Sequence, residues 1–280
     1  MYNYKKYNER KYKEDYWVIN RSQNKWFSNY VKLKIFKKWA ARVKNKQIFL
    51  DIGGGVGNWA FHFLKTFKQV AVLDISKEAL KKIPEKDIIK IQSSITRMKV
   101  KDNYADCIFL ADVLEHIHEK DLNKAFSEIS RITKKEGKII AFTSEYGFGL
   151  PILIARILGK TTGRLMNGEI NEGHVNRMRF SELNKLCENN GLKIINYYHY
   201  GILFQPITDF IKDRLAVVLQ GHNNKEVRAG QEIKNKLKVS ENLFLKIVFG
   251  CLSFLSYLDI LIFGKVIPGS SVFLEIKKSE

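Results

Sequence analysis

The sequence is poor in residues that break regular structure and in residues that cross-link it. Its 280 residues include four prolines, 18 glycines and three cysteines, whereas hydrophobic residues make up 45%. So few breakers among so many core-forming residues exclude a disordered linker and a collagen-like chain. A chain of this length and hydrophobicity can bury at least one full core, so we expect one large domain, alone or with an appendage.

The three cysteines, Cys107, Cys187 and Cys251, lie far apart and form no C-x-x-C pair. This spacing predicts neither a disulfide framework nor a zinc site, and we expect no metal. Unpaired thiols fit a reducing compartment, so the sequence predicts a cytoplasmic protein. A secretory signal peptide is not expected either, because about twenty mostly polar and aromatic residues precede the first apolar stretch.

Acidic residues are scarce, and the resulting charge is unevenly spread. The chain has 29 Asp and Glu against 48 Lys and Arg, a formal charge of +19, and residues 1–47 alone hold 14 of the basic residues and three of the acidic ones. A basic arm that also contains many tyrosines and tryptophans suits nucleic acid or an anionic membrane surface. A solvated arm that only keeps the protein soluble is the third interpretation.

Short apolar runs alternate with helical patterns through the middle of the chain. We predict strands at 47–51, 70–73, 88–91, 106–110 and 138–143. Helices are expected after the first strand (over Trp59 to Phe67), at 76–82 with Ser76 as its N-cap, and near 122–132. Towards the C-terminus we predict a helix at 180–190 that ends at Gly191, and strands at 192–198 and 271–276. Such alternation requires a parallel sheet with crossover helices, so the predicted fold class is α/β.

Two insertions interrupt this alternation. Residues 145–173 are rich in glycine and follow the fifth strand, where a cover over an active site would lie. Residues 203–267 include the apolar stretch Leu243–Phe263, which is long enough to span a bilayer. A single crossing would separate the last strand from its sheet. Three interpretations of the stretch therefore stay open: a helix buried on the domain, a homodimer contact, or a helix in the membrane interface.

The glycine-rich segment Leu50 to Asn58 lies between a predicted strand and a predicted helix. Glycines at such a turn allow positive φ and let a ligand approach the backbone. A dinucleotide-binding G-x-G-x-x-G fingerprint that starts at Gly53 would need glycine at position 58, which is Asn58. The pattern is instead D-x-G-x-G-x-G, with Asp51 two residues before the first glycine.

The D-x-G-x-G-x-G segment resembles the first motif of the class I S-adenosylmethionine-dependent methyltransferases. The segment Ala111 to His116 (ADVLEH) is similar to the corresponding part of the type 11, ubiquinone-biosynthesis-like branch. The resemblance covers about residues 47–200 and 270–277. It implies a Rossmann-like, doubly wound, mostly parallel seven-stranded sheet with an antiparallel last strand. The implied domain comprises 47–202 and 268–280, with an N-terminal arm and helix at 1–46 and a helical insertion at 203–267.

The resemblance also implies S-adenosylmethionine as the cofactor and assigns residues to it. Asp51 would help hold the amino end of the cofactor, and Asp74 would accept the ribose hydroxyls in a charge-assisted contact. Ser94 stands where the family usually has an acidic residue near the adenine. The complete set of implied cofactor residues is Asp51, Gly53, Gly54, Gly55, Gly57, Asp74, Ile75, Ser94, Ile95 and Ala111.

Methyl transfer is an in-line displacement in which the protein positions the reactants and can supply a base. The candidate bases are His116, after the fourth strand, and His174, at the end of the predicted cover. A structural role for each histidine is the alternative. Glu145 and Tyr146 are expected on the acceptor side, and His199 is expected to pack at a strand end.

The absence of one motif after the fourth strand limits which acceptor the enzyme is expected to methylate. Enzymes that methylate exocyclic base nitrogens generally have an Asn/Asp-Pro-Pro-aromatic segment after the fourth strand, whereas this chain has Ala111 to Leu114 there. We therefore expect a small-molecule, lipid-like or saccharide acceptor, methylated at oxygen, by a cytoplasmic enzyme that is either free or peripheral at the inner face of the membrane. The alternatives are an RNA methyltransferase guided by the basic arm and a non-catalytic membrane-associated protein.

Overall fold

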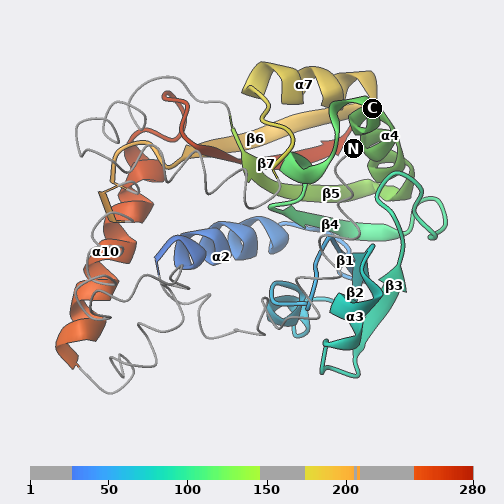
Figure 1. Cartoon of the computed structure of the whole chain (residues 1–280), viewed down its shortest axis with the longest axis horizontal. Coiled ribbons are helices and arrows are strands. Elements are labelled where there is room, and N and C mark those ends of the chain that lie inside the picture. The colour runs from blue at the N-terminus through green and yellow to red at the C-terminus, as the bar shows by residue number, and fades with distance from the viewer. Residues whose placement is uncertain (1–26, 146–173, 205–206, 209–242, 280) are drawn as a thin grey trace.

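The computed structural model describes residues 27–145, 174–204, 207–208 and 243–279, shown as coloured ribbon in Figure 1. Of the predicted cover, only Glu145 falls among them. The first 26 residues of the basic arm, Tyr146 and most of residues 205–242 of the predicted helical insertion also lie outside the described residues.

A seven-stranded sheet forms the centre of the protein, in the order β3-β2-β1-β4-β5-β7-β6. The strands β1 to β5 are parallel, and β7 runs antiparallel to both of its neighbours, β5 and β6. The sheet confirms the predicted α/β class and the antiparallel last strand. The strand bounds are β1 Ile48–Ile52, β2 Gln69–Asp74, β3 Ile88–Gln92, β4 Ala105–Ala111, β5 Thr133–Ser144, β6 Leu192–Tyr200 and β7 Ser271–Lys278.

Helices cover both faces of the sheet (Figure 1). On one face, α4 (Glu119–Ile132) and α7 (Phe180–Asn189) bury their apolar sides against the strands. On the other, α2 (Phe27–Ala40) and the short α3 (Lys77–Lys81) pack on the sheet. Ser76 caps α3, because its Oγ accepts a hydrogen bond from the Ala79 N–H at 3.2 Å.

The helix predicted after the glycine segment is shorter and less regular than expected. The chain there forms turns around the 3-10 helix η2 (Ala60–Phe63), with hydrogen bonds that span three residues as well as four. The reason lies in its aromatic residues, which favour helix weakly and gain more from stacking. Phe63 stacks on Phe49 with ring centroids 4.3 Å apart, and Trp59 meets Phe36 edge-on at 5.3 Å.

The helix α2 belongs to the hydrophobic core, although it comes from the basic N-terminal region. Phe36 and Trp39 are fully buried. The Phe36 ring contacts Phe109 of β4 edge-on at 4.6 Å and Phe273 of β7 at 5.6 Å. Part of the basic region is therefore needed to close one face of the sheet.

The apolar stretch near the C-terminus forms α10 (Leu243–Ile262), which packs on α2 and against the end of β6. The carboxylate of its fully buried Asp259 accepts hydrogen bonds from the backbone N–H groups of Ile202, Leu203 and Phe204, at 3.2, 3.0 and 2.8 Å. One side of α10 is thus fixed to the chain that leaves β6. Among the helices of the described segments, none is long and apolar enough to cross a membrane.

We expect Asp259→Ala to lower the free energy of unfolding by about 3 kcal/mol or more, because the substitution leaves three backbone donors at this buried site without their acceptor. Asp259→Asn, which retains one oxygen, should cost less. The exposed Asp87→Ala is the matched control and should change stability by no more than about 0.5 kcal/mol. Urea denaturation measures all three, and equal midpoints for Asp259→Ala and Asp87→Ala would show that the buried carboxylate anchors nothing.

Candidate functional site

The carboxyl ends of β1 and β4 lie side by side at the point where the strand order reverses. In open α/β sheets, ligands bind at such a switch point, just beyond the carboxyl ends of the strands. Asp51 lies in β1 and the glycines follow it, Asp74 ends β2, and Ala111 ends β4. The topology thus brings the predicted cofactor residues of three strands to one edge of the sheet.

Asp51 carries a carboxylate that the protein does not neutralise. Its side chain is buried, and its Oδ2 atom has no hydrogen-bond partner among the described residues. Burial raises the pKa of Asp51 well above its usual range, the nearby Asp74 raises it further, and a hydrogen bond from the Ala60 backbone opposes the shift. A buried acceptor atom without a donor is costly, so the position is suited to a ligand that brings a positive charge and N–H donors.

Two glycines of the loop cannot be replaced without disturbing their neighbours. Gly53 has a φ of +68°, and a Cβ atom there would lie 2.7 Å from Cγ2 of Val113. A Cβ at Gly54 would lie 2.6 Å from the carboxyl carbon of Asp51. The backbone therefore passes directly against the Asp51 carboxylate, so position 54 tolerates no side chain.

Asp74 connects the glycine loop to the end of β2. Its Oδ2 accepts a hydrogen bond from the Gly55 N–H at 2.9 Å, and its Oδ1 accepts one from the Ser76 N–H at 2.8 Å. Burial raises the pKa of Asp74, and these backbone hydrogen bonds oppose the rise. Because each carboxylate oxygen can accept more than one hydrogen bond, both can still accept from a ligand hydroxyl. The next residue, Ile75, is half-buried beside them.

Ser94 and Ile95 lie in the loop between β3 and β4. The Ser94 hydroxyl is 2.9 Å from Oγ1 of Thr96, so it takes part in the local turn. Ile95 is half-buried against the core.

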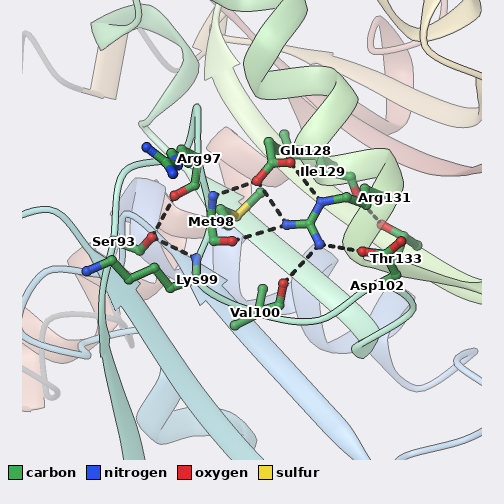
Figure 2. A network of polar contacts seen from close by, with 10 residues as sticks. All are labelled: Ser93, Arg97, Met98, Lys99, Val100, Asp102, Glu128, Ile129, Arg131 and Thr133. Atoms are coloured by element: carbon green, nitrogen blue, oxygen red, sulfur yellow. Dashed lines mark hydrogen bonds and ion pairs between the residues drawn. The ribbon is translucent and has the colours of Figure 1, made fainter.

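Arg131 of α4 holds this loop in place, and Figure 2 shows the network around it. Its guanidinium donates to the backbone oxygens of Met98 and Val100, at 3.1 and 2.9 Å, and pairs with Asp102 at 2.6 Å. Glu128 accepts from both Arg131 and the Met98 N–H. These contacts could not be predicted from the sequence, because Arg131 is about thirty positions from Met98, Val100 and Asp102 and forms no local motif with them.

The end of β4 is joined to α2 by an ion pair. Lys32 Nζ lies 2.9 Å from Oδ2 of Asp112 and 3.9 Å from the ring centroid of Phe142. Asp112 has a φ of +57°, a left-handed conformation that Asp tolerates better than most residues. Sequence reasoning placed the basic N-terminal region outside the cofactor-binding part of the chain, whereas Lys32 reaches the residue next to Ala111.

Glu115 is buried behind this edge and fixes the chain that follows the predicted cover. Its carboxylate accepts a hydrogen bond from Thr143 Oγ1 at 2.9 Å, and its backbone oxygen accepts from the N–H groups of Val175 and Asn176. Burial, with a further contribution from Asp112, raises the pKa of Glu115 to about 7.

The candidate bases lie together at the same edge. The rings of His116 and His174 meet edge-on with centroids 4.9 Å apart, although the residues are far apart in sequence. A third imidazole, that of His199 in β6, lies beside Glu145, which follows β5: Nδ1 of His199 is 2.6 Å from Oε2 of Glu145, and both residues are buried. His199 packs against Phe180 and Tyr197 as well. Its carboxylate partner was not foreseen, because the two residues lie 54 positions apart.

Comparison with known proteins agrees with this geometry. Residues 50–141 match the family model of the type 11 methyltransferase domain. The chain is 36% identical over 124 residues to an uncharacterized protein of Methanocaldococcus jannaschii, covering 41% of this chain and 53% of that protein. It is 30% identical over 122 residues to the ubiquinone/menaquinone biosynthesis C-methyltransferase UbiE of Serratia proteamaculans, covering 40% and 46%. The match thus spans about half the length of each relative.

Among solved structures, a similar one is phosphoethanolamine N-methyltransferase 2 of Haemonchus contortus, bound to phosphomonomethylethanolamine and S-adenosylhomocysteine. The TM-score is 0.60 at 15% identity, over 100% of this chain and 61% of that one. At this identity the likeness concerns the fold.

The sheet has the fold of the class I S-adenosylmethionine-dependent methyltransferases, and residues 50–141 match a methyltransferase domain. The similarity to the type 11 family extends over residues 50–141, about a third of the chain.

The raised pKa of Glu115 predicts a pH-dependent stability that Glu115→Gln should remove. The folded state keeps the Glu115 proton up to about pH 7, whereas the unfolded chain loses it near 4.5. The stabilisation from this group is therefore complete below 4.5 and lost as the pH rises to 7, on the order of 3 kcal/mol in all.

Urea denaturation at about pH 5 and about pH 8 tests this expectation. The free energy of unfolding of the wild type, relative to Glu115→Gln, should fall between the two pH values. The control is Glu119→Gln, at an exposed site on α4. The difference in free energy of unfolding between the wild type and this control should be the same at both pH values. A constant difference for both variants would contradict the buried, protonated state of Glu115.

Proposed function

We propose that the protein catalyses methyl transfer from S-adenosylmethionine to a small-molecule or lipid-like acceptor. The observation that carries the proposal is the buried, unpartnered Oδ2 of Asp51 beside the glycine loop. The cofactor, when bound, supplies a methyl group activated by its sulfonium centre. Asp51 would receive the ammonium of the methionine part, Asp74 the ribose hydroxyls, and the chain at Ile75 and Ile95 the adenine.

The electrostatics of the site support this assignment. Asp51 and Asp74 are both buried, and Asp74 raises the pKa of Asp51, so a cationic ligand would stabilise the charged form of Asp51. The one cation that the described residues place at this edge in an ion pair, Lys32, is bound to Asp112 instead.

The acceptor would approach from the carboxyl ends of β4 and β5. Buried groups that can hold or take up a proton gather there: Glu115, and the Glu145–His199 pair, with His116 and His174 close to Glu115. Such groups suit an acceptor that loses a proton as it is methylated, for which we propose a hydroxyl oxygen. A group among these acts as the base only if it contacts the acceptor.

The alternative functions have weaker support. An RNA methyltransferase would use the basic N-terminal region to bind phosphates, but Lys32 is committed to Asp112 and the motif that holds a flipped base is missing. A non-catalytic protein on this fold would gain nothing from a buried Asp51 whose Oδ2 has no partner in the described part of the chain. Formation of S-adenosylhomocysteine with any acceptor would exclude it.

Asp51→Asn tests how the cofactor is held. Because Oδ2 has no partner within the described protein, the substitution should leave the stability of the ligand-free protein unchanged or raise it. Affinity for S-adenosylmethionine and S-adenosylhomocysteine should fall about tenfold to a hundredfold, the loss of one charged hydrogen bond.

The control for this prediction is a ligand rather than a second variant. Methylthioadenosine has the adenosine part but lacks the amino and carboxyl groups, so calorimetry should show that wild type and Asp51→Asn bind it equally well. Equal affinity of the two proteins for S-adenosylmethionine would contradict the role of Asp51, and absence of binding to the wild type would contradict the function itself.

A further inference from the structure

A continuous apolar stripe runs along the side of α10 that faces away from the sheet. Ile247, Phe254 and Leu261 follow one another at intervals of seven residues, so they lie on one line along the helix. These three and the neighbouring Ile262 are 55–59% exposed. Aligned apolar side chains of this size are uncommon on a soluble surface that has no partner.

The opposite side of α10 is fully used by the fold. Leu252, Ser256, Asp259 and Ile260 are buried. Asp259 binds the backbone after β6, and Ser256 Oγ lies 3.0 Å from Oγ1 of Thr208. The helix is therefore held in a fixed orientation, and the stripe is not a face that could turn inward.

A basic surface adjoins the stripe. Lys34, Lys37 and Lys38 are exposed and occupy one side of α2, at the i, i+3 and i+4 spacing of neighbours on a helix. The helix α2 contains four lysines and no acidic residue. Lys34 Nζ lies 3.9 Å from the ring centroid of Tyr257, so the basic side of α2 meets α10 directly. The single acidic residue of α10, Asp259, is on its buried side.

We propose that the α10 stripe and the lysines of α2 dock the protein on an anionic membrane surface, with α10 lying in the interface plane. A helix that presents apolar side chains on one side next to lysines has the chemistry of such interfacial helices. A second copy of the chain fits less well, because pairing the stripes would bring together two lysine-rich helices of chains that each carry a formal charge of +19.

Docking on a membrane does not require the methyl-transfer function proposed above, but it would bring the candidate site close to a lipid-like acceptor. The helix α2 contacts α10 through Lys34 and the edge of the candidate site through Lys32. One short helix thus connects the docking surface to the carboxyl edge of the sheet. An acceptor with a lipid-like part could then reach the site from the membrane surface.

Co-sedimentation with vesicles made of equal parts phosphatidylglycerol and phosphatidylcholine tests the proposal. The full-length wild type should sediment with these anionic vesicles. It should not sediment with vesicles of pure phosphatidylcholine. Phe254→Gln/Leu261→Gln should weaken binding by about a hundredfold or more, since two large side chains no longer enter the interface. Glutamine favours helix, so α10 should stay folded.

Two further variants separate the apolar and the charged contributions. Lys37→Gln/Lys38→Gln leaves α10 unchanged and should weaken vesicle binding about thirtyfold. Added salt should weaken binding of the wild type in the same way, because it screens the attraction between these lysines and the anionic lipids. Ile89→Gln/Ile195→Gln removes two exposed apolar residues from the sheet and should bind like the wild type.

Three outcomes would overturn the proposal. The first is a wild type that does not bind the anionic vesicles, and the second is one that binds both vesicle types equally. The third is a dimer in light scattering that Phe254→Gln/Leu261→Gln converts to a monomer, which would assign the stripe to a second copy. None of these outcomes bears on binding of S-adenosylmethionine, so this proposal and the methyl-transfer function can fail separately.

Discussion

The buried carboxylate of Asp51, whose Oδ2 has no hydrogen-bond partner among the described residues, is the constraint around which the candidate site is arranged. Proteins rarely bury an acceptor oxygen in this way, and the cost is several kcal/mol when nothing compensates. Here the backbone of Gly54 passes directly against the carboxylate, and Asp74 ties the loop to β2 nearby. The free protein therefore keeps an electrostatic strain that a cationic ligand would relieve.

Distant parts of the chain hold this arrangement in place. Arg131 of α4 fixes the loop that contains Ser94 and Ile95. Lys32 of α2 binds Asp112 beside the end of β4, and Glu115 binds the chain that returns after residue 173. The site edge is thus assembled from both layers of helices, so its geometry depends on the packing of the whole domain as well as on the glycine motif.

The strands and the glycine loop after β1 could be predicted from the sequence because both are local. The strand positions follow from apolar runs that end in glycine or acidic residues, and Ser76 is recognisable as an N-cap from its neighbours alone. The irregular η2 could not be predicted, because stacking of Trp59 and Phe63 on distant rings outweighs the helical periodicity. Contacts between distant residues are likewise visible only in the structure. The residues joined in the pairs Lys32–Asp112 and Glu145–His199, and in the contact of Asp259 with Ile202, lie 54 to 80 positions apart in the sequence.

Calorimetric titration of the full chain shows directly whether the carboxyl edge of β1 and β2 binds S-adenosylmethionine. We expect one binding site per chain. Asp74→Ala should abolish the heat or weaken binding at least about tenfold, whereas Asp87→Ala, at an exposed position before β3, should bind as tightly as the wild type. No heat with the wild type, or equal affinity for all three proteins, would contradict this expectation.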